Sequence, residues 1–254
     1  MNQRKTDPEF SEERVVPDFK EQHNLFQEHF ARYKFAAKYV LGKQVLDAAC
    51  GCGYGGKLFA DSGAQKVTGI DISKAAIKYS TTHYRSSGLT FKLMDCQKLL
   101  FKDQAFDVVT AFEFIEHLSL PGRFLREVDR VLKTQGVFVI STPNNLRNSP
   151  IENKYHFREY NAVSLRSLLK PFFSKIDLYG QRYKPSITRR TKHRQKLVNS
   201  VPKFVTRYLP SGLKDYLFSR LINHYLLNLK NEADFNIDQN EIGTATHLIG
   251  VCYK

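Results

Sequence analysis

The sequence feature that most constrains the fold is a glycine-rich stretch at residues 45–56, which reads Val-Leu-Asp-Ala-Ala-Cys-Gly-Cys-Gly-Tyr-Gly-Gly. It follows a short apolar run typical of a buried strand and precedes a segment with helical spacing. Glycines in such a position let the backbone turn sharply and approach a ligand closely. The helix that follows offers unpaired N–H groups and the positive end of its dipole. The stretch therefore predicts a ligand-binding turn between a strand and a helix.

The rest of the chain repeats this alternation. Short runs rich in apolar, β-branched or aromatic residues predict strands at 44–49, 66–70, 89–94, 105–112, 136–141, 175–183 and 246–253. Helical spacing predicts helices at 21–40, 54–62, 121–132 and 162–169, and Ser73 is placed to cap a further helix. Strands separated by helices imply right-handed crossovers and a mostly parallel sheet with helices on both faces. The fold class is therefore α/β.

The length allows one such domain with an embellishment, because 254 residues that are 42% hydrophobic can bury one full core. We expect a polar tail (1–20), a core with an N-terminal cap helix (21–179), a basic helical insertion (180–240) and a closing strand of the core sheet (241–254). Residues 180–230 carry twelve Lys or Arg against the single acid Asp215, which is +11 of the net charge of +14. The strong basicity therefore belongs to the insertion.

The four cysteines are few and irregularly spaced, which indicates reduced thiols in a cytoplasmic protein (Cys50, Cys52, Cys96 and Cys252). Their spacing matches neither a zinc-binding nor a redox motif, so we expect neither a metal site nor a thiolate nucleophile. The N-terminus is polar, which predicts no signal peptide, and no apolar run approaches the roughly 18–20 residues of a membrane span.

Taken alone, the glycines leave the identity of the ligand open. Gly51, Gly53 and Gly56 also satisfy G-x-G-x-x-G, the fingerprint of dinucleotide-binding folds. An NAD(P)-dependent oxidoreductase is therefore an alternative at this point.

Acidic residues at three successive strand ends favour a different ligand. Asp47 ends the first strand, where a carboxylate repels a pyrophosphate and attracts a cationic amino-acid group. Asp71 ends the second strand, placed to accept both ribose hydroxyls. Asp95 follows the third strand, where it suits a hydrogen bond to an adenine amino group. Together they describe a ligand with an amine, a ribose and an adenine but no phosphate.

In these motifs residues 40–142 resemble the class I methyltransferases that use S-adenosylmethionine. The similar segments are Asp47-x-x-x-Gly51-x-Gly53-x-Gly55, Asp71, Met94-Asp95-Cys96, Phe106-Asp107-Val108-Val109, Glu113-x-x-Glu116-His117-Leu118 and Arg126-Glu127-Val128-x-Arg130-Val131-Leu132-Lys133-x-x-Gly136. The resemblance implies a Rossmann-like sheet of seven strands with one antiparallel strand, at 246–253. It also implies a set of contacts to S-adenosylmethionine from Arg32, Asp47, Ala49, Gly51, Gly53, Gly55, Asp71, Ile72, Asp95, Cys96 and Phe112.

Within that set Arg32 has two open interpretations. It lies on the N-terminal helix, which in this family often covers the cofactor, and a guanidinium matches the methionyl carboxylate. The alternative is an ordinary surface arginine.

Two histidines are the candidates for catalysis. His117 follows the fourth strand on the side expected for the acceptor, and His156 lies in the segment after residue 143. A general base is needed if the acceptor is a hydroxyl and contributes about 10²–10⁴-fold. The alternative for His117 is that it caps a helix or binds a backbone carbonyl.

The predicted activity is methylation of a small-molecule acceptor, on the oxygen of a sugar, a glycolipid or another cell-envelope intermediate. The segment at 141–160 resembles bacterial methyltransferases associated with such pathways. The basic run at 189–196 lies beside an amphipathic pattern at 218–229, which predicts that residues 180–230 contact the inner face of an anionic membrane peripherally. Nucleic acid is a less favoured partner. A non-catalytic adaptor with the cofactor fold is the alternative from another class. The sequence does not determine the oligomeric state.

Overall fold

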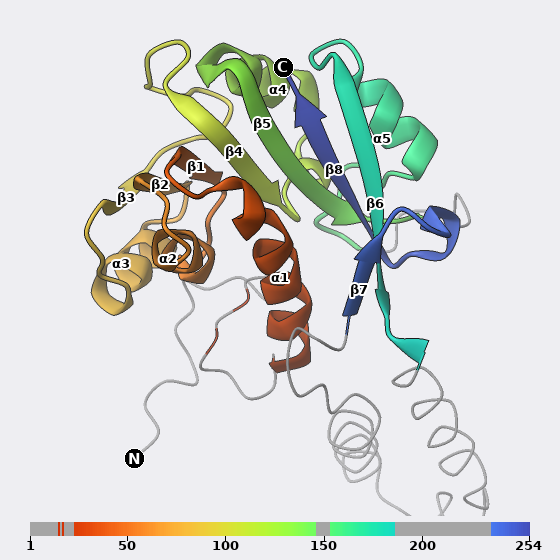
Figure 1. Ribbon diagram of the computed structural model, residues 1–254, viewed down its shortest axis with the longest axis horizontal. Helices are drawn as coiled ribbons and strands as arrows, with labels where there is room; N and C mark the ends of the chain where they lie inside the picture. The colour runs from red at the N-terminus through yellow and green to blue at the C-terminus, as the bar shows by residue number, and fades with distance from the viewer. Residues whose placement is uncertain (1–14, 16, 18–22, 146–152, 186–234) are drawn as a thin grey trace, which may run out of the picture.

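The computed structural model describes residues 15, 17, 23–145, 153–185 and 235–254. Its described residues form one eight-stranded sheet in the order β3-β2-β1-β4-β5-β8-β6-β7. The strands are β1 (Gln44–Ala48), β2 (Lys66–Asp71), β3 (Leu89–Leu93), β4 (Phe106–Phe112), β5 (Leu132–Pro143), β6 (Lys175–Tyr183), β7 (Phe235–Asp238) and β8 (His247–Tyr253). Figure 1 shows them as a twisted sheet with helices on both sides.

The α/β class and the mostly parallel sheet are confirmed. Strands β1 to β5 pair in parallel, and β8 runs antiparallel to β5, as expected for the closing strand. The sheet has one strand more than the seven that the resemblance implies. The additional strand is β7, which pairs antiparallel with β6 through the register Tyr183↔Phe235 to Gly180↔Asp238.

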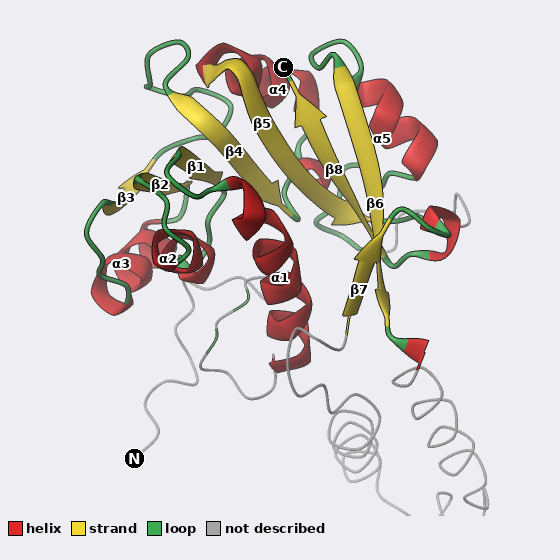
Figure 2. Cartoon of the chain, in the orientation of Figure 1, coloured by secondary structure: helices red, strands yellow, loops and turns green. Residues whose placement is uncertain are grey.

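Five α-helices connect or cover the described strands (Figure 2). They are α1 (His23–Ala36), α2 (Tyr54–Asp61), α3 (Lys74–His83), α4 (Pro121–Val131) and α5 (Ala162–Leu169). The Ser73 side chain accepts a hydrogen bond from the Ala76 N–H and caps α3 as predicted. Short 3-10 turns extend the pattern, among them η2 (Ala37–Tyr39) and η3 (Ile115–His117).

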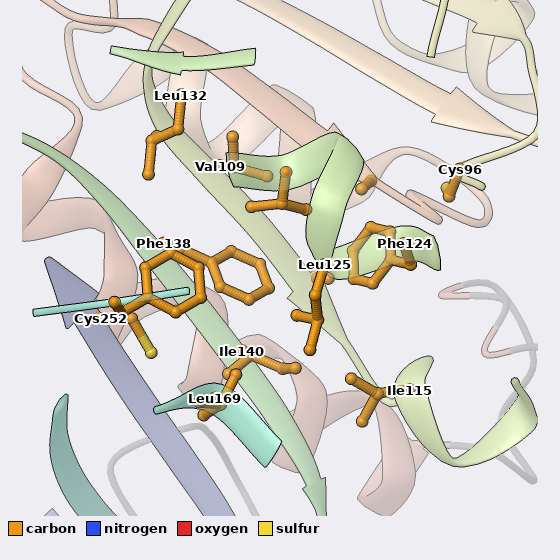
Figure 3. Packing of buried hydrophobic residues seen from close by; sticks show 14 of the residues in the cluster. Cys96, Val109, Ile115, Phe124, Leu125, Leu132, Phe138, Ile140, Leu169 and Cys252 are labelled. Atoms are coloured by element: carbon orange, nitrogen blue, oxygen red, sulfur yellow. The ribbon is translucent and has the colours of Figure 1, made fainter. Parts of the chain in front are cut away.

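Each face of the sheet has its own buried core, because successive side chains of a strand point to opposite faces. In β4, Val109 and Ala111 join the core beneath α4 and α5, whereas Val108 and Phe112 join the core beneath α1 and α2. Central strands buried on both faces explain why β4 is an almost unbroken apolar run. Figure 3 shows the first core, with Phe124 of α4 packed toward the sheet.

The predicted insertion lies almost entirely outside the described residues. Strand β6 continues to Tyr183 and β7 begins at Phe235, so the sheet borders this segment on both sides. The basic run and the amphipathic pattern fall within residues 186–234, and membrane contact there stays a prediction. Among the helices that are described, none is both long and apolar enough to cross a bilayer.

Candidate functional site

The candidate site is a cavity of about 610 Å³ at the carboxyl ends of the parallel strands. From β1 the chain adds β2 and β3 on one side and then β4 and β5 on the other. Open α/β sheets bind their ligands at such a reversal of strand order. The described residues that line the cavity are Val15, Leu25, His29, Tyr33, Ala49, Cys50, Gly51, Cys52, Tyr54, Asp71, Ile72, Asp95, Cys96, Gln97, Phe112, Glu113, Phe114, Glu116, His117, Leu118, Pro143, Asn153 and His156.

The turn after β1 forms one wall with its backbone. Ala49 and Gly51 both have positive φ angles, of 55° and 52°. A β-carbon added at Gly51 would meet no protein atom within 4 Å. The turn therefore leaves room for a ligand to lie directly against the main chain, which only glycine allows without a side chain in the way.

Asp71 at the end of β2 is held in place by the same turn. Its Oδ2 accepts a hydrogen bond from the Gly51 N–H at 3.0 Å, and its Oδ1 accepts one from the Ser73 N–H at 2.8 Å. The side chain is buried yet lines the cavity. Each carboxylate oxygen can accept more than one hydrogen bond, so Asp71 presents a pre-oriented pair of acceptors on the cavity wall.

The outer end of the cavity carries the predicted adenine-side residues. Asp95 is exposed, and its Oδ1 accepts a hydrogen bond from the Gln97 N–H at 2.8 Å. Ile72 lines the rim with an exposed side chain, while Cys96 is buried in the wall. Burial raises the pKa of the Cys96 thiol to about 12, so it is neutral at physiological pH.

Two of the predicted cofactor glycines are not on the cavity wall. A β-carbon at Gly53 would fall 2.4 Å from Cβ of Ser80 and 2.8 Å from the Phe91 ring. A β-carbon at Gly55 would fall 1.9 Å from Cε1 of Tyr33. These positions need glycine because other parts of the protein pack on them, and neither glycine lines the cavity, so their contact with a cofactor stays a prediction.

Asp47 is likewise one layer behind the wall. Its fully buried carboxylate accepts hydrogen bonds from the hydroxyl groups of Thr110, at 2.8 Å, and Tyr33, at 3.2 and 3.3 Å. Burial raises the pKa of Asp47 to about 7, against the opposing effect of these hydrogen bonds. Tyr33 and not Asp47 lines the cavity, so the carboxylate acts on the site through that tyrosine.

Arg32 is fully buried, so the interpretation as a surface arginine is wrong. Its Nη1 donates to Oε1 of Gln181 at 2.6 Å, and its Nε lies 3.7 Å from Oε1 of Glu113. The Nε and Nη2 atoms have no hydrogen-bond partner among the described residues. Arg32 does not itself line the cavity, but Glu113 beside it does. A buried guanidinium with unused donors is an anion-binding group at the inner edge of the site.

Glu113 occupies a backbone conformation that is unusual for its residue type, with φ 51°. Its Oε1 accepts a hydrogen bond from the Ser141 hydroxyl at 2.6 Å, and its Oε2 lies 3.3 Å from Nε2 of His247. Burial alone would raise its pKa, but Arg32 and His247 hold the pKa of Glu113 well below the usual value. A stable negative charge therefore faces the cavity here.

The two predicted catalytic histidines lie together at the other end of the cavity. Their ring centroids are 5.0 Å apart. Nδ1 of His117 lies 3.1 Å from the Tyr155 carbonyl oxygen, so it is the protonated nitrogen and Nε2 carries the lone pair. The contact with a backbone carbonyl, given above as the alternative to catalysis, is thus present, and a catalytic role of His117 stays a prediction.

His156 is held by two side chains. Its Nδ1 lies 3.2 Å from Oε1 of Glu159, and its Nε2 lies 3.1 Å from Nδ2 of Asn153. The Asn153 amide is oriented because its Oδ1 accepts a hydrogen bond from the Tyr155 N–H at 2.9 Å. Both ring nitrogens of His156 are therefore within hydrogen-bond distance of a side chain.

Several residues that line the cavity were missed from the sequence, among them His29, Tyr33, Glu113 and Glu116. His29 and Tyr33 are four residues apart on α1, the spacing that puts two side chains on one helix face. Burial lowers the pKa of His29 well below its usual value, so its ring is neutral. Glu116 directly precedes His117 in the sequence motif, and this position was a signal that Glu116 also lines the cavity. Burial and the charge of Glu113 raise the pKa of Glu116 well above its usual value.

The charge of the cavity wall is one-sided. Carboxyl groups of Asp71, Asp95 and Glu113 line it, the raised pKa of Glu116 favours a neutral fourth, and none of the described lining residues is Lys or Arg. Such a wall attracts a cationic ligand and repels phosphates.

Comparisons with known proteins agree with this geometry. A family model described as "Methyltransferase domain" matches residues 41–194. A probable S-adenosylmethionine-dependent methyltransferase of Mycolicibacterium smegmatis is 36% identical over 163 residues, which is 62% of each chain. A ubiquinone biosynthesis O-methyltransferase of Pasteurella multocida is 34% identical over 139 residues, covering 50% of this chain and 57% of the relative. The chain thus spans less than two thirds of the length of these curated relatives.

A solved structure gives the same fold. An N-methyltransferase of Haemonchus contortus, in complex with phosphomonomethylethanolamine and S-adenosylhomocysteine, superposes with a TM-score of 0.59 at 16% identity. The match covers 88% of this chain and 52% of that one. At this identity the likeness shows the Rossmann-like fold.

Proposed function

The chain belongs to the S-adenosylmethionine-dependent class I methyltransferases, and on that premise we propose that it methylates a hydroxyl oxygen of a small-molecule acceptor. The acceptor class that we propose is a sugar, a glycolipid or another cell-envelope intermediate. The observation that carries the proposal is the cavity wall, which joins a rigid ribose acceptor at Asp71 to a histidine base at His117.

The residues fit the cofactor. The open space above Gly51 accommodates a ligand against the backbone, and Asp71 presents two oriented oxygens to a ribose. The acidic wall suits a sulfonium and an amino group, while the unused donors of Arg32 suit a carboxylate. When bound, S-adenosylmethionine supplies a methyl group activated by its positive sulfur. The same acidic wall, without Lys or Arg among its described residues, argues against a pyrophosphate and hence against the oxidoreductase alternative.

The acceptor end supports oxygen as the methylated atom. A hydroxyl is a weak nucleophile until its proton is removed, and we assign that step to Nε2 of His117 because this residue lines the cavity and its Nδ1 is oriented by the Tyr155 carbonyl. In the balanced reaction the acceptor oxygen gains the methyl carbon, the sulfur keeps the electron pair of the broken bond, and His117 holds the proton. The ubiquinone O-methyltransferase among the relatives is in keeping with this choice.

The test of cofactor binding is calorimetric titration with S-adenosylmethionine, S-adenosylhomocysteine and NADPH. We expect the first two to bind the wild-type protein, and Asp71→Ala to abolish that binding. Binding of NADPH instead would overturn the proposal. Binding without turnover on any acceptor would favour the non-catalytic adaptor.

The test of chemistry is an acceptor screen that measures S-adenosylhomocysteine formation with matched hydroxyl and amine compounds. We expect His117→Asn to lower kcat about 10²–10⁴-fold on a hydroxyl acceptor without changing cofactor affinity. The matched control is His83→Asn, because His83 is exposed on α3 and does not line the cavity. Turnover restricted to amines, unaffected by His117→Asn, would contradict O-methylation.

A further inference from the structure

The acceptor end of the cavity contains a compact group of side chains with more donor atoms than a simple base requires. Glu116, His117 and His156 each offer one donor atom, and the three atoms lie within 4.8 Å of one another. They come from two separate segments that are joined by main-chain hydrogen bonds. The N–H groups of Phe157 and Arg158 donate to the Glu116 carbonyl oxygen at 2.9 and 3.2 Å.

Each of the three side chains is oriented from behind by another group. The Tyr155 carbonyl accepts from Nδ1 of His117, and the Glu159 carboxylate accepts from Nδ1 of His156. Histidines that bind metal ions almost always donate their second ring N–H to a carbonyl or a carboxylate in this manner.

The carboxylate of Glu116 has the same kind of support. Its Oε2 accepts a hydrogen bond from the Thr142 hydroxyl at 3.1 Å, and metal-binding carboxylates are themselves usually hydrogen-bonded. Glu116 is 1% exposed by area, yet it lines the cavity.

We propose that Glu116, His117 and His156 bind a divalent transition-metal cation through one carboxylate and two Nε2 atoms. The donor set of two imidazoles and one carboxylate suits Zn²⁺ and its first-row neighbours better than Mg²⁺ or Ca²⁺. Because all three residues line the cavity, a cation held by them would be open to the space proposed for the acceptor. This inference rests on the proposed methylation of a hydroxyl oxygen and replaces the base role proposed for His117 with a role as metal ligand.

Binding requires a small local rearrangement. Zinc–ligand bonds of about 2.0–2.1 Å place the donor atoms of a tetrahedral site about 3.3–3.5 Å apart, closer than the present limit of 4.8 Å. The Asn153 amide, whose Nδ2 is 3.1 Å from Nε2 of His156, must also give up that hydrogen bond. Small changes in side-chain torsion angles would supply both movements.

A cation in this position changes the task of His117 from base to ligand. A hydroxyl bound to the cation through its oxygen loses its proton more readily, because the positive charge stabilises the alkoxide. The proton then passes to solvent, the alkoxide oxygen forms the new bond to carbon, and the sulfur retains the electron pair of the bond that breaks.

The experiment uses the tag-free full chain, stripped of metals with a chelator and titrated with Co²⁺. We expect visible d–d absorption from the bound ion, which Zn²⁺ then abolishes by competition. Replacing any one ligand, in Glu116→Gln, His117→Gln or His156→Gln, should weaken Co²⁺ binding by more than 100-fold. Glu159→Gln, which removes only an orienting group, should weaken it by about 10–100-fold.

His83→Gln is the matched control and should bind Co²⁺ as the wild type does. Failure of the wild-type protein to give the Co²⁺ spectrum, or affinity unchanged in all three ligand variants, overturns the proposal. The wild-type spectrum keeps the test valid if a variant does not fold. Calorimetry with S-adenosylmethionine on the same metal-free sample separates the two hypotheses, because cofactor binding without Co²⁺ binding rejects only the metal site.

Discussion

The ring of Tyr33 lies directly on the backbone of Gly55, where an added β-carbon would fall 1.9 Å from Tyr33 Cε1. The same tyrosine donates its hydroxyl hydrogen to Asp47 and packs edge-on against Phe112, with ring centroids 4.7 Å apart. One side chain from α1 therefore joins the glycine-rich turn, the end of β1 and the end of β4. Helix α1 can pack here, with Tyr33 lining the cavity, because residue 55 is glycine and leaves room for the ring.

We expect Gly55→Ala to destabilise the protein by about 1–3 kcal/mol, because the methyl group displaces a ring that has no space to move within the packed core. Urea unfolding followed by circular dichroism measures this loss. Gly122→Ala is the control, because its β-carbon in α4 would meet only the flexible Arg126 side chain, at 3.7 Å. Equal urea midpoints for the two variants would show that Tyr33 does not depend on Gly55.

Gly51→Ala should weaken binding of S-adenosylmethionine by at least tenfold, with only a small effect on folding. Its β-carbon would meet no protein atom within 4 Å and would instead occupy ligand space. Gly42→Ala is a matched control, since Gly42 also has a positive φ and an open environment but does not line the cavity. Calorimetry measures the affinities. Thermal unfolding measures the loss of folding free energy, about 1 kcal/mol, that both variants share because alanine replaces a glycine with positive φ. Similar affinities for both variants would contradict the close approach at Gly51.

Arg32→Gln should reduce affinity for S-adenosylhomocysteine about 10–100-fold, the equivalent of losing a charge-assisted hydrogen bond. Affinity for 5′-methylthioadenosine, which lacks the carboxylate, should change little. Because removing Arg32 leaves Glu113 buried without its partner, Arg32→Lys provides a version that keeps the charge. Calorimetry measures the affinity of the variants for both ligands. An equal loss of affinity for both would show that Arg32 has a purely structural role.

The contribution of Asp47 to protein stability should fall as the pH rises from about 4 to about 7. The pKa of Asp47 is raised from 3.8 to about 7 by burial, so over this range the folded state binds a proton that the unfolded state has lost. The contribution is fully present below pH 3.8 and is lost as the pH passes 7. Asp47→Asn keeps the hydrogen-bonding shape and should flatten this part of the profile, measured as urea midpoints at several pH values. A wild-type profile with the same slope as the variant would show that Asp47 does not carry the effect.

The strand–helix order of residues 44–143 was predictable, because buried parallel strands are continuous apolar runs and helices carry a different spacing. The short strand β7 was not predicted. It contains only four residues, Phe235–Asp238, and it exists because β6 offers it a free edge after Gly180. Pairing with a distant strand is a tertiary event that leaves little trace in the local sequence.

By itself the sequence determined the α/β class, the turn at Gly51 and the acid at Asp71, because each depends on residues adjacent in the chain. Only the tertiary structure decided which of the motif residues line the cavity. Gly55 and Asp47 lie behind Tyr33 of α1, and Arg32 of the same helix is buried beside Glu113. The meeting of Glu116 and His117 with His156 also required the fold, because the two segments are far apart in sequence and are joined by backbone hydrogen bonds. Spacing along the chain specifies which chemistry is available, whereas packing between elements specifies where each group points.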